Sequence, residues 1–229
     1  MIEQNYRNVM RRIAAASLRA GVSAGEVELV AVSKGRSVEE IAEALRAGIT
    51  DIGENRVQEA VLKYNSIPNM QCPIRPKWHM VGHLQTNKAR DAVRIFDLIH
   101  SVDSLRLAEE IDRQAARSGK VQDILIEVKT SPEDSKYGIG PDELPLLIEG
   151  INALGNIRLQ GLMTVAPAVD HPEKARPYFK MLKELFDFAN TRLPIDRRLS
   201  TLSMGMTDDF EVAIEEGSTM VRLGRCLFT

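Results

Sequence analysis

The sequence has little cysteine, few aromatic residues and no long apolar run. Only Cys72 and Cys226 occur, far apart and without a CxxC pair, so neither a disulfide framework nor a metal site is indicated. No apolar stretch is long enough to span a bilayer. The first residues lack the basic and apolar regions of a signal peptide. We therefore expect a cytoplasmic protein without a metal.

Charge of one sign is also lacking, because the formal net charge is only -2. No basic excess marks a surface for nucleic acid or membrane. The hydrophobic fraction of 44% and the charged fraction of 27% are ordinary for a globular protein. No low-complexity segment or Pro/Gly-rich linker divides the 229 residues, and this length suits one barrel domain. We expect a single domain over residues 1–229.

Strand-like and helix-like segments alternate after a first amphipathic helix at residues 6–20. Eight strands are predicted at residues 29–33, 51–53, 78–81, 98–102, 124–128, 159–164, 201–203 and 220–223. Helical patterns lie between them, among others at residues 38–45, 105–116 and 172–190. Eight strands with helical cover predict an α/β fold, a (β/α)8 TIM barrel with an extra N-terminal helix.

An open doubly wound sheet is the alternative architecture. That fold normally carries a glycine-rich phosphate turn after its first strand. Here the first strand is followed by Lys34-Gly35-Arg36-Ser37, which lacks that pattern. The barrel is therefore the favoured fold.

Lys34 closes the first predicted strand, after the run Glu28-Leu29-Val30-Ala31-Val32-Ser33. Barrel enzymes place their sites at the carboxyl ends of the strands. A lysine amine in that position can form a Schiff base with an aldehyde or a ketone. Taken alone, Lys34 is better explained as the first solvated residue after a buried strand.

Two further strand ends suit a phosphorylated ligand. Ser203 and Gly205 precede a helix entry, and a hydroxyl, a glycine and a helix N-terminus suit a phosphate, although an ordinary capped turn has the same pattern. Arg222 falls inside the last strand, where it either pairs with a carboxylate or faces a ligand. Barrel closure sets the last strand beside the first, so Arg222 and Lys34 approach one cavity. Pyridoxal 5′-phosphate has the matching layout.

Three other polar residues receive less weight. His79 and His83 are four residues apart, but the segment between them reads as strand and turn rather than as a helix that would hold a metal. Glu127 lies in a strand near the barrel interior, where we expect an internal salt bridge.

Motifs spread over nearly the whole chain resemble the pyridoxal phosphate homeostasis protein family, whose fold is similar to the barrel domain of alanine racemase. The matching segments are Ala31-Val32-Ser33-Lys34, residues 53–59, 78–88 and 135–138, Gly161-Leu162-Met163-Thr164, and residues 202–209 and 217–224. Together these motifs are highly specific. Family members usually continue with Gly and Arg beyond Phe228, so a contact from such a tail to the phosphate is not expected here.

The resemblance implies a barrel that binds pyridoxal 5′-phosphate as an aldimine on Lys34 and acts in intracellular vitamin B6 and amino-acid homeostasis. It implies that Arg222 faces the pyridine nitrogen and that Asn55 lines the site. The implied phosphate contacts are Ser203 and the backbone N–H groups of Gly224 and Arg225. Pyridoxal-phosphate-dependent apoenzymes are candidate recipients of the cofactor.

Efficient catalysis is not expected. An arginine at the pyridine nitrogen disfavours its protonation and leaves a weaker electron sink. Racemisation needs an acid–base group on each face of the substrate carbon, and only Tyr137 is placed to reach the site. We expect a monomeric cofactor-binding protein. The alternatives are a pyridoxal-phosphate-dependent amino-acid racemase and a Schiff-base aldolase barrel without cofactor.

Overall fold

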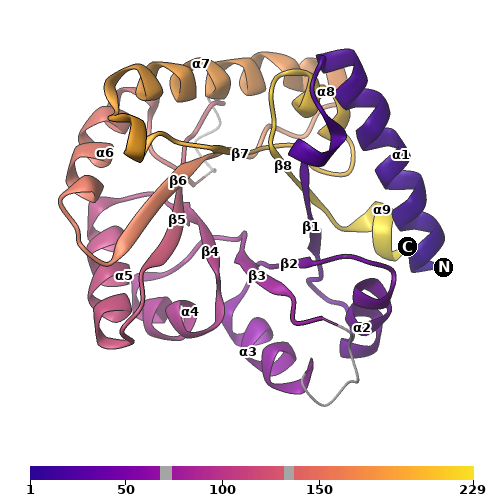
Figure 1. Ribbon diagram of the computed structural model, residues 1–229, viewed down its shortest axis with the longest axis horizontal. Helices are drawn as coiled ribbons and strands as arrows, with labels where there is room; N and C mark the ends of the chain where they lie inside the picture. The colour runs from indigo at the N-terminus through magenta and orange to yellow at the C-terminus, as the bar shows by residue number, and fades with distance from the viewer. Residues whose placement is uncertain (68–73, 132–136) are drawn as a thin grey trace.

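The computed structural model describes residues 1–67, 74–131 and 137–229. Eight parallel strands, β1 to β8, pair in sequence order and form a closed barrel that helices surround (Figure 1). The strands are β1 Glu28–Val32, β2 Asp51–Glu54, β3 Lys77–Met80, β4 Leu98–Val102, β5 Gln122–Glu127, β6 Ile157–Met163, β7 Thr201–Ser203 and β8 Met220–Leu223. The predicted barrel is confirmed.

The predicted N-terminal helix is present, and helices alternate with the strands. In the described ranges they are α1 Ile2–Ala20, α2 Val38–Arg46, α3 Val57–Ser66, α4 Ala89–Ile95, α5 Leu105–Arg117, α6 Leu144–Asn152, α7 Arg176–Arg192, α8 Phe210–Glu215 and α9 Arg225–Phe228. The helix predicted at 172–190 is divided into a short 3₁₀ turn, Pro172–Ala175, and α7. Pro177 explains the break, because it has no N–H to donate to the preceding turn.

The first and the last strand of the barrel, β1 and β8, pair with each other. Val30 lies beside Arg222 and Ala31 beside Leu223. This pairing closes the barrel and brings the residues that follow β1 next to those that follow β8. It therefore sets Lys34 at the same end of the barrel as Gly224.

Apolar side chains form two separate groups. The larger group packs the outer face of the strands against the helices. The smaller group lies inside the barrel and consists of Val30, Leu98, Leu125, Met163 and Met220. Since residues i and i+2 of a strand share a face, Arg222 faces inward like Met220, and Glu127 like Leu125.

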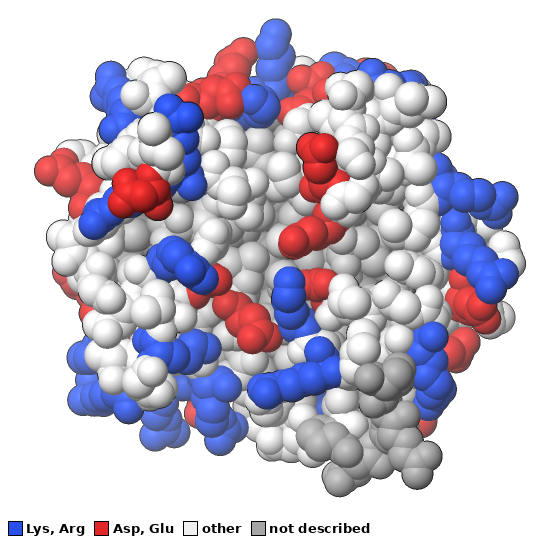
Figure 2. Space-filling model, viewed as in Figure 1, with Lys and Arg blue, Asp and Glu red and all other residues white. Residues whose placement is uncertain are grey.

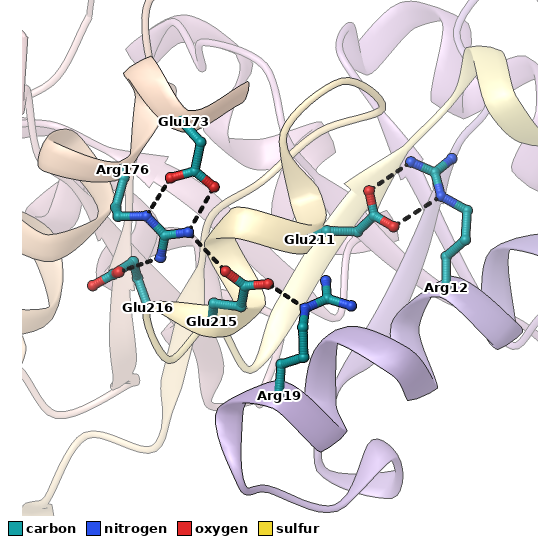
Figure 3. Close-up of polar contacts among 7 residues, drawn as sticks. All are labelled: Arg12, Arg19, Glu173, Arg176, Glu211, Glu215 and Glu216. Atoms are coloured by element: carbon teal, nitrogen blue, oxygen red, sulfur yellow. Dashed lines mark hydrogen bonds and ion pairs between the residues drawn. The ribbon is translucent and has the colours of Figure 1, made fainter. Parts of the chain in front are cut away.

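Helix α1 packs along α8 and α9, with Val9, Ile13 and Ala16 buried on its inner face (Figure 1). Ion pairs border this contact (Figure 3). Arg12 Nη2 lies 2.9 Å from Glu211 Oε2, and Arg19 Nε lies 2.6 Å from Glu215 Oε1.

Arg176 extends this ion-pair network from α8 to α7 (Figure 3). Its guanidinium group contacts Glu173, Glu215 and Glu216 at 2.6 to 2.7 Å. Exposed ion pairs contribute little individually. The Glu215 carboxylate of α8 pairs with both Arg19 of α1 and Arg176 of α7, so the network links these three helices.

Acidic and basic side chains both occur across the face shown in Figure 2, in agreement with the small net charge. Across the ranges that the structure describes, every helix falls short of the length and apolar character needed to cross a membrane.

Gly161 on β6 is expected to be intolerant of a side chain. It pairs with Thr201 on β7, and an added Cβ would lie 1.8 Å from the Thr201 carbonyl oxygen. Gly161→Ala should lower the free energy of unfolding by about 1–3 kcal/mol, as overpacking does. Urea unfolding measures the loss. Gly155→Ala is the control, because its Cβ would meet nothing within 4 Å. Equal stability of the two variants would contradict this account.

Candidate functional site

Lys34 lies in the turn directly after β1, and its side chain is exposed. Its amine makes no hydrogen bond or ion pair with any residue in the described part of the chain. The backbone on either side is held, because the Ser33 carbonyl accepts a hydrogen bond and the Gly35 N–H donates one. The amine is therefore free to react while its point of attachment is fixed.

Arg222 lies inside the barrel, where only 4% of its surface is exposed. Its Nη1 donates to Ser203 Oγ at 2.6 Å, and its Nη2 donates to the Thr164 carbonyl oxygen at 2.8 Å. Burial lowers the pKa of Arg222 to about 10, although Glu127 and Asp209 act in the opposite direction. Arg222 therefore remains a cation at neutral pH. Its hydrogen bonds go to a hydroxyl and a carbonyl, not to a carboxylate.

Arg222 terminates a chain of buried hydrogen bonds that crosses the barrel. Ser203 Oγ lies 3.0 Å from His100 Nδ1. His100 Nε2 lies 3.0 Å from His79 Nδ1, and His79 Nε2 lies 2.9 Å from Asp51 Oδ1. All five side chains are buried. The chain joins β2, β3, β4, β7 and β8.

The donors in this chain assign both histidine tautomers. The Arg222 guanidinium can only donate and the Asp51 carboxylate can only accept, so with neutral imidazoles the Ser203 hydroxyl donates to His100 Nδ1. His100 then donates through Nε2 to His79, and His79 donates through Nε2 to Asp51. Each imidazole is neutral in this arrangement. Burial is the largest cause that holds the pKa of His100 well below its usual value, which agrees with a neutral His100 ring.

Asp51 is the anion at the other end of the chain. Burial acts to raise its pKa, but hydrogen bonds from His79 and Thr50 outweigh burial and hold the pKa below its ordinary value. A buried cation and a buried anion are thus connected through neutral groups, which satisfies the polar atoms between them.

Glu127 at the end of β5 is buried, with 7% of its surface exposed. The expectation of an internal salt bridge for Glu127 is wrong, because none of the described residues places a cationic nitrogen within 4.0 Å of its carboxylate. Glu127 Oε2 is buried and accepts no hydrogen bond from the described residues. Burial raises the pKa of Glu127 to about 7, in spite of the charge of Arg222. Near neutral pH the Glu127 carboxyl group is therefore divided between its protonated and its charged form.

The predicted phosphate contacts lie around the ends of β7 and β8. Ser203 is fully buried, and its hydroxyl is already engaged by Arg222 and His100. Gly224 lies beside the end of β1, where an added Cβ would approach the Val32 carbonyl oxygen to 3.2 Å. The backbone N–H groups of Gly224 and Arg225 donate to none of the described residues.

The remaining predicted positions surround the same barrel end. Arg225 begins α9, and its exposed side chain pairs with Asp208. Asp209 is the residue before α8, as the sequence predicted for a helix entry, and its carboxylate accepts from Met206 N. Asn55 follows β2 and lines a cavity of about 700 Å³ together with His83 and Lys88. Ser135 and Lys136 of the matched motifs, like Cys72, lie outside the described residues.

The structure brings Ser203 and Arg222 into direct contact, and Gly224 against the end of β1. Lys34 and Arg222 both lie near the pairing of β1 with β8, but their side chains do not touch. Sequence reasoning missed the role of Asp51, His79 and His100 as one interior chain. Their positions in otherwise apolar strands were a usable signal, but only strand pairing shows that they meet.

Comparison with known proteins gives consistent matches. The profile of the family "Alanine racemase, N-terminal domain" matches residues 2–229. A "Pyridoxal phosphate homeostasis protein" of Aquifex aeolicus (strain VF5) is 42% identical over 225 residues, which cover 98% of this chain and 96% of that protein.

Two solved structures are similar. PipY of Synechococcus elongatus PCC7942, solved with PLP bound, has 35% sequence identity and a TM-score of 0.86, and the match covers 100% of both chains. An alanine racemase of Clostridium difficile 630 has 16% identity and a TM-score of 0.70 over 98% of this chain and 56% of that chain. The second likeness shows the fold alone.

The raised pKa of Glu127 predicts a pH-dependent stability. A carboxyl group whose pKa is higher in the folded protein stabilises it below the unfolded pKa, and this contribution is lost as pH rises through about 7. The loss should amount to about 3 kcal/mol. Glu127→Gln should remove this part of the pH dependence, measured by urea unfolding at about pH 4.5 and about pH 8. Glu109→Gln on exposed α5 is the control. An unchanged pH dependence in Glu127→Gln would rule out the account.

Proposed function

This chain belongs to the alanine racemase N-terminal domain family and, within it, to the pyridoxal phosphate homeostasis proteins, and we propose that it binds pyridoxal 5′-phosphate covalently through Lys34. The observation that carries this proposal is the exposed amine of Lys34, which pairs with none of the described residues and is held at the barrel end where Arg222 and Gly224 also lie. The protein then acts in intracellular vitamin B6 and amino-acid homeostasis.

The residues at this barrel end fit the cofactor. Bound pyridoxal 5′-phosphate supplies an aldehyde that condenses with a primary amine, with loss of one water. Lys34 supplies the amine. The N–H groups of Gly224 and Arg225, which lack described acceptors, are suited to the phosphate oxygens.

Arg222 and Asn55 complete the proposed site. Arg222 is a fixed cation, since its two hydrogen bonds and the interior chain leave it no freedom to turn away. Facing the ring nitrogen, it disfavours a proton there. Asn55 follows β2 at the same end of the barrel, and its contact with the cofactor stays a prediction. Ser203 supports this arrangement by holding Arg222, and a direct contact from Ser203 to the phosphate stays a prediction.

We propose further that the protein binds or carries the cofactor without efficient catalysis. Tyr137 is 57% exposed, and its ring is stacked on His83 with centroids 3.8 Å apart. It is thus directed towards His83 rather than poised as a second acid–base group.

The setting of this function is proposed on the same basis. We place the protein in the cytoplasm as a monomer with one domain over residues 1–229, and we take cofactor-dependent apoenzymes as recipients. Cys226 is a free thiol, which suits a reducing compartment.

Lys34 is expected to be the attachment point. Wild-type protein incubated with pyridoxal 5′-phosphate and reduced with borohydride should carry a pyridoxyl group on the peptide that contains Lys34. Lys34→Ala should lose the adduct and its visible absorbance, because no other amine occupies this position. Lys129→Ala, which removes a half-buried lysine beyond β5, should keep both. An adduct that maps mainly elsewhere would refute the assignment.

The absence of efficient catalysis is tested by exchange of the alanine α-hydrogen in deuterated water. We expect the exchange rate with loaded protein to stay within about tenfold of the rate with the same concentration of free cofactor, since none of the described residues is poised as a second acid–base group. Nuclear magnetic resonance follows the signal. Rapid exchange that disappears in Lys34→Ala would instead establish the racemase alternative.

A further inference from the structure

Lys63 on α3 is a buried lysine that the proposed cofactor contacts do not include. Only 6% of its surface is exposed. Its Nζ donates to the Ser33 carbonyl oxygen at 2.6 Å, to Glu54 Oε1 at 2.6 Å and to Glu59 Oε1 at 2.7 Å. An ammonium group has three protons, so all of its donor capacity is used.

The two carboxylates bound by Lys63 also contact the segment around Lys34. Glu59 Oε1 accepts from the Gly35 N–H at 2.7 Å, and Glu54 Oε1 accepts from Ser33 Oγ at 2.5 Å. The backbone groups immediately before and after Lys34 are therefore bound to one cluster, Lys63, Glu54 and Glu59, here called the Lys63 cluster. Gly35 has a φ of 70°, so the chain turns sharply just after Lys34.

Burying the charged groups of the Lys63 cluster costs free energy, so a need to fill space does not explain a lysine at position 63. Burying an ammonium group requires several matched partners, and well-packed apolar side chains of similar volume often give equal or greater stability. Glu54 shows the cost directly: burial raises its pKa in spite of Lys63, and its Oε2 accepts no hydrogen bond from the described residues.

Glu59 is the more exposed carboxylate of the cluster. Burial acts to raise its pKa, but hydrogen bonds from Lys63 and the Gly35 N–H lower it on balance. The anion that holds Gly35 is thus itself held by Lys63. An apolar residue at position 63 could fill the same space, but it could not fix Ser33 and Gly35.

We propose that Lys63 is a positioning residue for Lys34, which holds the backbone of residues 33–35 so that the Lys34 amine meets the cofactor aldehyde in the correct place. The proposal rests on the proposed function in taking Lys34 as the attachment site. Lys63 itself does not touch the reacting atoms, since its three protons are engaged below the turn.

Two variants test the cluster, with one matched control. Lys63→Met removes the ammonium group and keeps most of the side-chain volume. Glu59→Ala removes the acceptor for Gly35 from a position that is only half-buried, so the fold should tolerate it. The control is Lys183→Met on α7, which also removes a lysine that pairs with a carboxylate four residues away, Asp187.

The first measurement needs no cofactor. Hydrogen exchange of the Gly35 backbone amide in the cofactor-free protein should be about tenfold or more faster in Lys63→Met and Glu59→Ala than in wild type and Lys183→Met. Urea unfolding confirms that each variant is folded. Unchanged protection of Gly35 in both variants would overturn the proposal.

The second measurement is the rate of attachment. The second-order rate constant for pyridoxal 5′-phosphate binding, followed by visible absorbance, should fall about tenfold or more in both variants and remain unchanged in Lys183→Met, because a misplaced amine meets the aldehyde less often. Faster exchange at Gly35 with an unchanged attachment rate would show a purely structural cluster and refute the positioning role. If wild type forms no adduct at Lys34, the proposed function fails, and with it the positioning role, whereas the exchange result still decides whether Lys63 holds the turn.

Discussion

Closure of the barrel between β1 and β8 sets the geometry of the whole molecule. The register that sets Val30 beside Arg222 joins the two ends of the sheet and removes both of its edges. It also sets the turn of Lys34 beside the start of α9. Arg36 from that turn donates to the Phe228 carbonyl oxygen, so the turn after the first strand contacts the last helix of the chain. A site shared by the first and the last strand exists only because the sheet closes.

The barrel interior combines an apolar layer with a polar chain. Val30, Leu98, Leu125, Met163 and Met220 fill part of it. The chain from Asp51 to Arg222 passes through groups that are neutral, so the charges reside at its ends. This arrangement holds the guanidinium of Arg222 through a hydroxyl and a carbonyl oxygen, and none of the described carboxylates pairs with it. An adjacent anion would have neutralised the cation that the proposed site uses.

Much of the fold was predictable because its signals are local. Alternating strand and helix patterns depend on neighbouring residues. Four of the predicted strands match or differ at one end only, and the other four differ by one or two residues at each end. The helix expected at 172–190 was divided by Pro177, a local effect that was visible in the sequence but was not used. Glu127 was misjudged for a different reason. Its sequence context shows a buried carboxylate, but whether a cationic side chain lies within reach depends on strands far away in the chain.

The order of the elements, the family motifs and the position of the Lys34 amine after a strand follow from the sequence alone, since each of these depends on residues close together in the chain. Which distant groups meet depends on the three-dimensional fold. Lys63 reaches back 30 residues to Ser33, and Ser203 lies between His100 and Arg222. Such contacts are set by strand register and helix packing, and hydrogen bonds are sensitive to shifts of a few tenths of an ångström. The residue types for both networks are present in the sequence, but their pairing is a property of the closed barrel.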